Sequence, residues 1–128
     1  MNVMREVRAH KKLDVWQESV ALATMVYQVT DKFPKSESFG LTSQMRRAVV
    51  SVPSNIAEGA ARTSPKEFAQ FLNIAGGSLS ELDTQIEIVR NLAYITTESK
   101  QALDDRISSI SRKLAGLIRK VKGAVNRE

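Results

Sequence analysis

The middle of the chain is its most informative part, and over residues 51–86 it reads SVPSNIAEGAARTSPKEFAQFLNIAGGSLSELDTQI. Ser64, Pro65 and Glu67 form a helix start, because serine suits the N-cap, proline the first helical position and glutamate the third. Apolar residues then alternate in steps of four and three, which is typical of a helix packed lengthwise against others. They are Phe68, Leu72, Ala75, Leu79, Leu82, Ile86, Val89 and Ala93. The pattern predicts a long helix over residues 65–94.

An amphipathic helix precedes this one, over residues 42–60. Its expected buried face comprises Leu41, Met45, Ala48, Val49, Val52, Ile56 and Ala60. Pro53 lies inside it and predicts a kink or a break, because proline frees the carbonyl of Val49. A serine hydroxyl or the Asn55 amide is a candidate to satisfy that carbonyl. In the following helix, Gly76 and Gly77 predict a close approach to another helix, since each glycine costs about 1 kcal/mol in a helix interior.

Two further helices complete the pattern, one at each end. Residues 14–32 carry two neighbouring apolar columns, and Pro34 ends that helix. The columns are Val15, Leu22, Val26, Val29 and Phe33, and Trp16, Val20, Ala23 and Tyr27. Residues 98–122 repeat the four-three alternation, with Thr97 as the expected N-cap. Its members are Leu103, Ile107, Ile110, Leu114, Leu117, Val121 and Ala124.

Four such segments joined by short loops favour an all-α, antiparallel up-down-up-down four-helix bundle. We expect one domain over residues 1–128, with short basic N-terminal and C-terminal tails. An alternative is a three-helix core with the fourth helix shared between chains.

Composition argues against several classes of function. There is no Cys and a single His, His10, in a basic terminus expected to be mobile, so neither a thiolate nor a histidine-rich metal site is expected. No apolar run approaches the roughly 20 residues that span a bilayer, and no apolar signal segment begins the chain. We therefore expect a cytoplasmic protein with no membrane contact, no cofactor and no small-molecule substrate. Nothing suggests acid–base chemistry by Glu58, so we do not expect an enzyme.

The basic character of the chain is concentrated at its ends. The net charge is +5, yet residues 13–105 carry eight basic and twelve acidic side chains, whereas residues 106–127 carry seven basic and none acidic. The cations expected to bind nucleic acid are Arg106, Arg112, Lys113, Arg119, Lys120 and Lys122, joined by Arg5, Arg8, Lys11 and Lys12. Basic columns that contain no acid repel one another unless anions lie near. Phosphates are one source of such anions, and carboxylates of a neighbouring helix, such as Glu81, Asp83 and Glu87, are the other.

One face of the second helix is polar. Its members, three or four residues apart, are Arg47, Ser51, Ser54, Asn55, Glu58 and Arg62. Three interpretations remain open: a solvated face, a contact with a subunit or partner, and a ligand site. Glu58 and Arg62 are spaced to form an i, i+4 ion pair.

Three stretches of the chain resemble a known family. KLDVWQESVALATMVYQVT, FGLTSQMRRAVVSVPSNIAEGAAR and SPKEFAQFLNIAGGSLSELDTQI are similar to bacterial four-helix-bundle proteins encoded in intervening sequences of 23S rRNA genes. The resemblance covers residues 13–117 and departs at Ala60, where many members carry a bulkier residue. It implies an antiparallel bundle that assembles as a ring-like homopentamer. A related fold is an accessory factor of a reverse transcriptase, with basic surfaces that bind nucleic acid.

These observations lead to two functional hypotheses. The first is a non-enzymatic, homo-oligomeric protein that binds RNA or DNA electrostatically and with weak sequence specificity. The second is a protein-interaction scaffold, or an accessory factor of a nucleic-acid-processing enzyme, that presents its polar stripe or basic ends to a protein.

Overall fold

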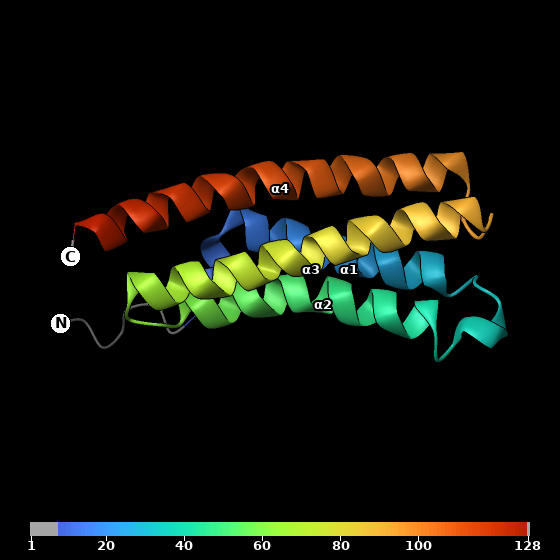
Figure 1. Cartoon of the computed structure of the whole chain (residues 1–128), viewed down its shortest axis with the longest axis horizontal. Coiled ribbons are helices and arrows are strands. Elements are labelled where there is room, and N and C mark those ends of the chain that lie inside the picture. The colour runs from blue at the N-terminus through green and yellow to red at the C-terminus, as the bar shows by residue number, and fades with distance from the viewer. Residues whose placement is uncertain (1–7, 128) are drawn as a thin grey trace.

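Four long helices lie side by side in the computed structural model, which describes residues 8–127 (Figure 1). They are α1 (Asp14–Thr30), α2 (Leu41–Ala60), α3 (Pro65–Asn91) and α4 (Thr97–Asn126). Two short 3₁₀ helices accompany them, η1 (Ala9–Lys12) before α1 and η2 (Lys35–Glu37) before α2. No strand occurs in the described residues, so the predicted all-α four-helix bundle is confirmed.

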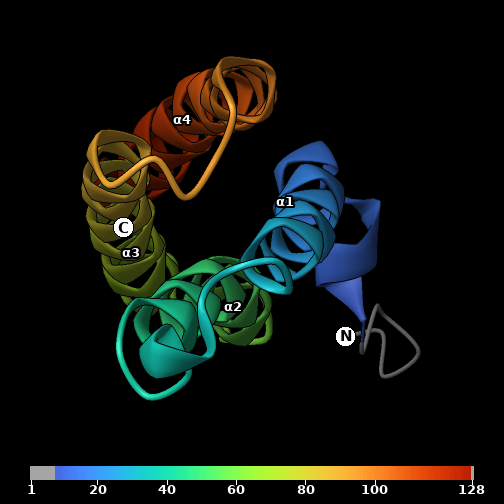
Figure 2. The same ribbon diagram turned by 90° about the vertical axis from the view of Figure 1, so that its right-hand side faces the viewer.

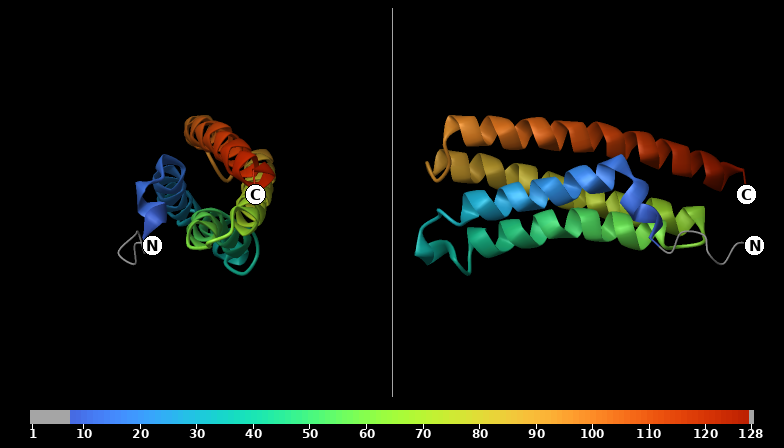
Figure 3. Two further views of the ribbon diagram at one scale, coloured as in Figure 1. Left: turned by 90° about the vertical axis from the view of Figure 1, so that its left-hand side faces the viewer. Right: turned by 180° about the vertical axis from the view of Figure 1, so that it is seen from behind.

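The helices follow one another around the bundle in chain order. Each helix packs against the next, and α4 returns to contact α1, as the end view shows (Figure 2). Because α1 is 17 residues long and α4 is 30, α4 extends well past the beginning of α1 (Figure 3). The last turns of α4 therefore lie beside α3 without α1 on their other flank.

The core is formed by the apolar positions that the spacing selects. Fully buried side chains come from all four helices, and they are Leu22, Val26, Met45, Val49, Val52, Ile56, Leu72, Leu82, Ile86, Val89, Leu103 and Ile110. Two members of the predicted α1 columns differ. Val20 and Tyr27 are 39% and 43% exposed, because they lie on the flank of α1 that points out of the bundle.

Several helix ends differ from the sequence prediction. Thr96, not Thr97, caps α4, and its hydroxyl accepts from the Ser99 amide at 3.0 Å. The expected C-terminal tail is instead helical as far as Asn126. α3 ends at Asn91, before residue 94, because Ala93 adopts a left-handed conformation with φ of 61°. The Tyr94 amide then bonds back to the Val89 carbonyl at 2.9 Å, which is the Schellman pattern of a helix end.

Other local predictions hold. The Ser64 hydroxyl accepts from the Glu67 amide at 3.4 Å, so the predicted start of α3 is confirmed. Pro53 is buried inside α2, which continues through it as one helix without the break that we considered. The Asn55 amide donates to the carbonyl of Ser51 rather than to that of Val49.

The closest helix contact occurs at a different glycine from those predicted. A Cβ on Gly76 would lie 3.7 Å from Leu114, an ordinary contact, and one on Gly77 would meet nothing within 4 Å. At Gly59 it would lie 2.8 Å from the Phe71 Cβ and 2.9 Å from the Phe68 ring. Gly59, near the corner between α2 and α3, is thus the residue that allows the two helices to approach.

Substituting alanine at two glycines should therefore have opposite effects. Gly59→Ala should lower the free energy of unfolding by about 1–3 kcal/mol, because the added methyl overpacks the α2–α3 contact. Gly77→Ala, the matched control, should raise it by up to about 1 kcal/mol through helix propensity. Urea denaturation followed by circular dichroism measures both, and a Gly59→Ala protein as stable as wild type would contradict this assignment.

Candidate nucleic-acid interface

The C-terminal half of α4 exposes a set of cations that bind nothing in the described chain. Between residues 112 and 127 the helix has no acidic residue. Its exposed cations without a hydrogen-bond or ion-pair partner in residues 8–127 are Arg112, Arg119, Lys120, Lys122 and Arg127. We call this set the distal basic face. It contains four of the six cations predicted for the fourth helix.

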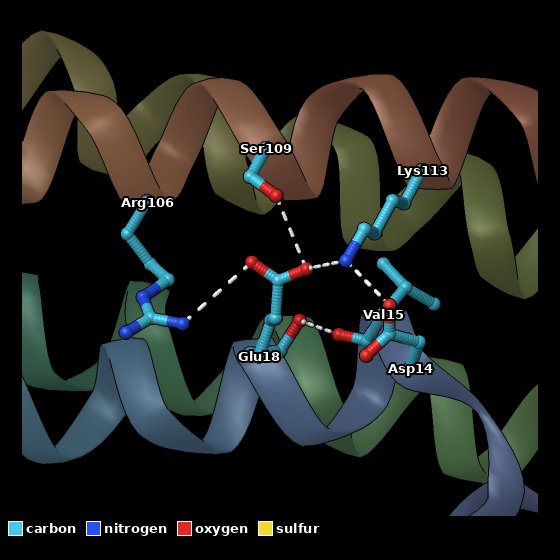
Figure 4. Close-up of polar contacts among 7 residues, drawn as sticks. Asp14, Val15, Glu18, Arg106, Ser109 and Lys113 are labelled. Carbon is cyan, nitrogen blue, oxygen red and sulfur yellow. Dashed lines mark hydrogen bonds and ion pairs between the residues drawn. The ribbon is translucent and has the colours of Figure 1, made fainter.

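The other two predicted cations, Arg106 and Lys113, contact α1 instead of standing free. Lys113 donates through Nζ to the carboxylates of both Asp14 and Glu18 (Figure 4). The Arg106 guanidinium lies 3.7 Å from the other oxygen of Glu18. These two cations therefore hold α4 against α1, and only 41% of the Lys113 side chain and 39% of the Arg106 side chain are exposed.

Glu18 is the central acceptor among these side chains, and we call Asp14, Glu18, Arg106, Ser109 and Lys113 the Glu18 cluster. Its side chain is only 12% exposed, and its carboxylate also accepts from the Ser109 hydroxyl at 3.1 Å. Burial alone would raise the pKa of Glu18, but hydrogen bonds from Lys113 and Ser109, together with the Lys113 charge, hold it below its ordinary value. Hydrogen bonds to Asp14 and Glu18 raise the pKa of Lys113 in turn. Glu18 and Lys113 are therefore both charged at neutral pH.

The acids of α3 do not neutralise the distal basic face in the way that we considered. Glu87 pairs with Lys100 at 2.8 Å, and Lys100 also pairs with Asp104 at 2.6 Å. Glu81 accepts from the buried Gln85 amide at 3.2 Å. Asp83 lines a hollow between α3 and α4 together with Arg112, but no ion pair joins the two. The neutralising acids belong to α1, and they do not reach the cations beyond residue 113.

The N-terminal cations belong to η1 or directly precede it, and η1 packs against α1 and α2. Arg8, Lys11 and Lys12 are exposed, while Arg5 lies outside the described residues. His10 is not in a mobile terminus, because it belongs to η1 and its ring meets that of Trp16 edge-on at 4.9 Å between centroids. Gln17 donates to the Lys11 carbonyl at 2.8 Å, which further fixes η1 against α1.

The polar stripe of α2 is divided between an internal contact and the surface. Ser51 bonds to Ser78 of α3 through their hydroxyls at 2.8 Å, and Asn55 donates to the Ser51 hydroxyl at 2.9 Å. These side chains join two helices of the same chain. The remaining members are exposed and include the predicted ion pair, at 3.2 Å; they are Arg47, Ser54, Glu58 and Arg62.

Exposed apolar side chains gather away from α4. Phe39, in the loop before α2, is 99% exposed, and sequence reasoning did not single it out. The other large exposed hydrophobic residues lie on α1, α2, α3 and the turn that follows α3, and they are Val20, Tyr27, Val50, Ile74, Ile88 and Leu92. Within the described residues α4 contributes none. One signal was available, since Phe39 falls in a polar loop, KSESFG, where no core position is expected.

In the part of the chain that the structure describes, no group of three or more His, Cys, Asp or Glu side chains is arranged to hold a metal ion. Among the helices of residues 8–127, none combines the length and apolar composition needed to cross a bilayer.

The Glu18 cluster should make stability depend on pH in the acid range. Because the folded-state pKa of Glu18 lies below the unfolded value of 4.5, its contribution is complete above that value and is lost as pH falls through the folded pKa. Glu18→Gln should cost about 1–2 kcal/mol at pH 7 and should flatten the fall in stability between about pH 5 and pH 3. Urea midpoints across this range provide the measurement.

A matched control for this prediction is Glu67→Gln. The Glu67 side chain is exposed and has no ion pair in residues 8–127, so this variant should keep the pH dependence of the wild type. Equal flattening in both variants would show that Glu18 has no special part in acid stability.

Comparisons with known proteins agree with the fold. The family model described as 23S rRNA-intervening sequence protein matches residues 11–116. A crystal structure of a protein of unknown function from the S23 ribosomal protein family of Bacteroides thetaiotaomicron superposes with a TM-score of 0.76 at 24% identity, over 82% of this chain and 95% of that one. A search of curated proteins returned no match. Since the family model spans most of the chain, this protein belongs to the 23S rRNA-intervening sequence protein family.

Proposed function

We propose that this protein is a non-enzymatic, homo-oligomeric nucleic-acid-binding protein of the cytoplasm. Its distal basic face would contact the phosphates of RNA or DNA, with little dependence on base sequence. The observation that carries the proposal is the separation of the α4 cations into two groups: Arg106 and Lys113 are neutralised by α1, whereas the distal basic face has no acid within its own helix half and no partner in residues 8–127.

Free energy favours a polyanion at such a face. Exposed cations close together on one helix raise one another's electrostatic energy, and a phosphate backbone relieves this while releasing its condensed counterions. Arg119 and Arg127 lie along the helix beside glycines, where an added Cβ would make only ordinary contacts with them. A Cβ added at Gly116 would lie 3.8 Å from a guanidinium nitrogen of Arg119, and one at Gly123 would lie 3.5 Å from a guanidinium nitrogen of Arg127. The cations are thus spread along the helix surface, as contact with successive phosphates requires.

Self-association is supported by the opposite side of the bundle. Phe39 is almost wholly exposed, yet its loop is anchored, because Glu37 accepts from the Leu41 amide at 3.1 Å and from the Tyr94 hydroxyl at 3.0 Å. A phenylalanine presented to solvent from an anchored loop suits a protein contact. A homopentamer, which the family resemblance implies, would repeat the distal basic face five times.

A second candidate is a protein-interaction scaffold, or an accessory factor of a nucleic-acid-processing enzyme. It is favoured by a hollow of about 560 Å³ whose lining includes Tyr27, Ser38, Arg46, Arg47 and Val50. Arg46 lies over the Tyr27 ring at 4.4 Å, so the hollow combines an aromatic surface with fixed positive charge. This arrangement fits a partner that offers apolar and acidic side chains.

Light scattering of the purified protein, with and without nuclease treatment, should report both parts of the proposal. We expect the protein particle to have several times the mass of the 14.2 kDa chain. Bound nucleic acid should add to this mass and absorb at 260 nm, and nuclease treatment should remove both contributions. A monomer free of nucleic acid at low salt would contradict the proposal. A partner protein that stays bound after nuclease treatment would favour the scaffold.

Charge reversal should locate the binding face. Arg112→Glu together with Arg119→Glu should abolish most nucleic-acid binding and make the remaining binding less dependent on salt, because two cations of the distal basic face become anions. Lys32→Glu together with Lys35→Glu changes the net charge equally at the other end of the bundle and should leave most of the binding intact. Equal losses in the two double variants would indicate that net charge, and not this face, governs binding.

A further inference from the structure

The outermost line of α4 is continuous and wholly exposed. It comprises Ser108, Arg112, Ala115, Arg119, Lys122 and Asn126, spaced alternately by four and three residues. On the opposite side of the helix Ile110, Leu114 and Val121 are buried against the bundle. The line therefore points away from the core and partly toward α3, where Ser108 and Arg112 also line a hollow between α3 and α4. The C-terminal end of α4 extends past the neighbouring helices (Figures 1 and 3).

The distal cations point in three directions from this line. At about 100° per residue, Arg112 and Arg119 share nearly one direction. Lys122 lies about 60–80° from that direction, at the α3 edge of the line, and Lys120 lies about 80–100° from it on the α1 side. Lys120 follows Lys113 by seven residues on the α1 side, but it lies beyond the beginning of α1 and so meets no carboxylate there. A flat surface or a single strand can meet only one flank of such a helix. A groove with a phosphate wall on each side meets both flanks and the outermost line together.

The dimensions select one kind of groove. An α-helix with its side chains is roughly 10–12 Å across, and the major groove of B-form DNA is about 12 Å wide. The major groove of A-form RNA is too narrow and deep for side chains on a helix to enter. Ser108 and Ala115 are small members of the outermost line, and they leave room for the helix to approach the groove floor.

The absence of an aromatic surface disfavours single strands. Proteins that hold single-stranded nucleic acid rely on stacking bases against aromatic side chains. The described part of α4 contains no aromatic residue. The two exposed aromatic side chains of residues 8–127, Tyr27 and Phe39, lie on α1 and before α2, and α2 is diagonally opposite α4 in the end view (Figure 2).

From this geometry we propose that the C-terminal half of α4 enters the major groove of double-stranded DNA with its exposed side. Arg112 and Arg119 face the groove floor, and Lys120 and Lys122 contact the phosphates of the two walls. This inference rests on the proposed nucleic-acid binding and narrows it to one class of ligand.

The test compares four ligands and one neutral substitution by fluorescence anisotropy at low salt. The ligands are a DNA duplex of about 25 base pairs, the same duplex with glucosylated 5-hydroxymethylcytosine filling its major groove, the RNA duplex of that sequence, and the single DNA strand. We expect the plain DNA duplex to bind at least about 10-fold more tightly than the other three. Ala115→Trp, which keeps the charge but widens the outermost line, should weaken plain-duplex binding by at least about 10-fold without weakening single-strand binding.

Controls separate the possible failures. Ser80→Trp, an exposed position on α3, should bind like the wild type, and circular dichroism should show every variant to be folded. Equal or tighter binding of single strands, RNA duplex or the filled duplex overturns the major-groove inference, as does an Ala115→Trp protein with wild-type affinity, while the proposed function stands. Binding of none of the four ligands overturns both.

Discussion

The largely buried carboxylate of Glu18 forms the polar contacts that join α1 to α4, the first and the last helix of the bundle. Every other pair of neighbouring helices is joined by a short connection, but α1 and α4 have only side chains to hold them together. Glu18 accepts hydrogen bonds from Ser109 and Lys113 and pairs with the Arg106 guanidinium at 3.7 Å, along two turns of α4, so it fixes the position of α4 along α1 as well as the contact itself. A single anion with two hydrogen-bond donors and one further cation around it defines the register of the two helices more specifically than apolar packing alone.

The position of this contact decides which cations are free. Lys113 meets Asp14, the first residue of α1, so every α4 residue beyond that level has passed the end of its acidic neighbour. Arg112 lies at the same level but is exposed on the side of α4 that faces away from α1. The difference in length between α1 and α4 therefore turns a uniformly basic stretch of sequence into two parts. The first part stabilises the bundle, and the second part remains available to anions from outside the chain.

Much of the fold could be predicted from the sequence because it depends on local rules. The cap of α3 follows from the residue types at 64, 65 and 67, and the core follows from the spacing of apolar residues. The contact between Glu18 and Lys113 could not be predicted in this way, since the two residues are 95 positions apart and meet only in one register of α1 against α4. Gly59 was missed for a similar reason: its close approach to Phe71 depends on how α2 and α3 cross at their corner. The left-handed Ala93 carries no composition signal, because glycine is the usual residue there.

The two ends of the bundle also differ in charge, because acidic and basic side chains are separated along α4. Near the start of α4, Glu87, Asp104 and Asp105 place acidic groups at one end of the bundle, while the distal basic face lies at the other. Lys100 neutralises part of the acidic end, so a polyanion is attracted most strongly to the distal basic face, although the chain as a whole carries only +5. Tyr27, Phe39 and Val50 lie on α1, before α2 and on α2, away from the distal basic face, so a contact between protein chains at these three residues leaves the cations exposed. Protein contact and anion contact can thus occur on one bundle at the same time, because they use opposite sides of it.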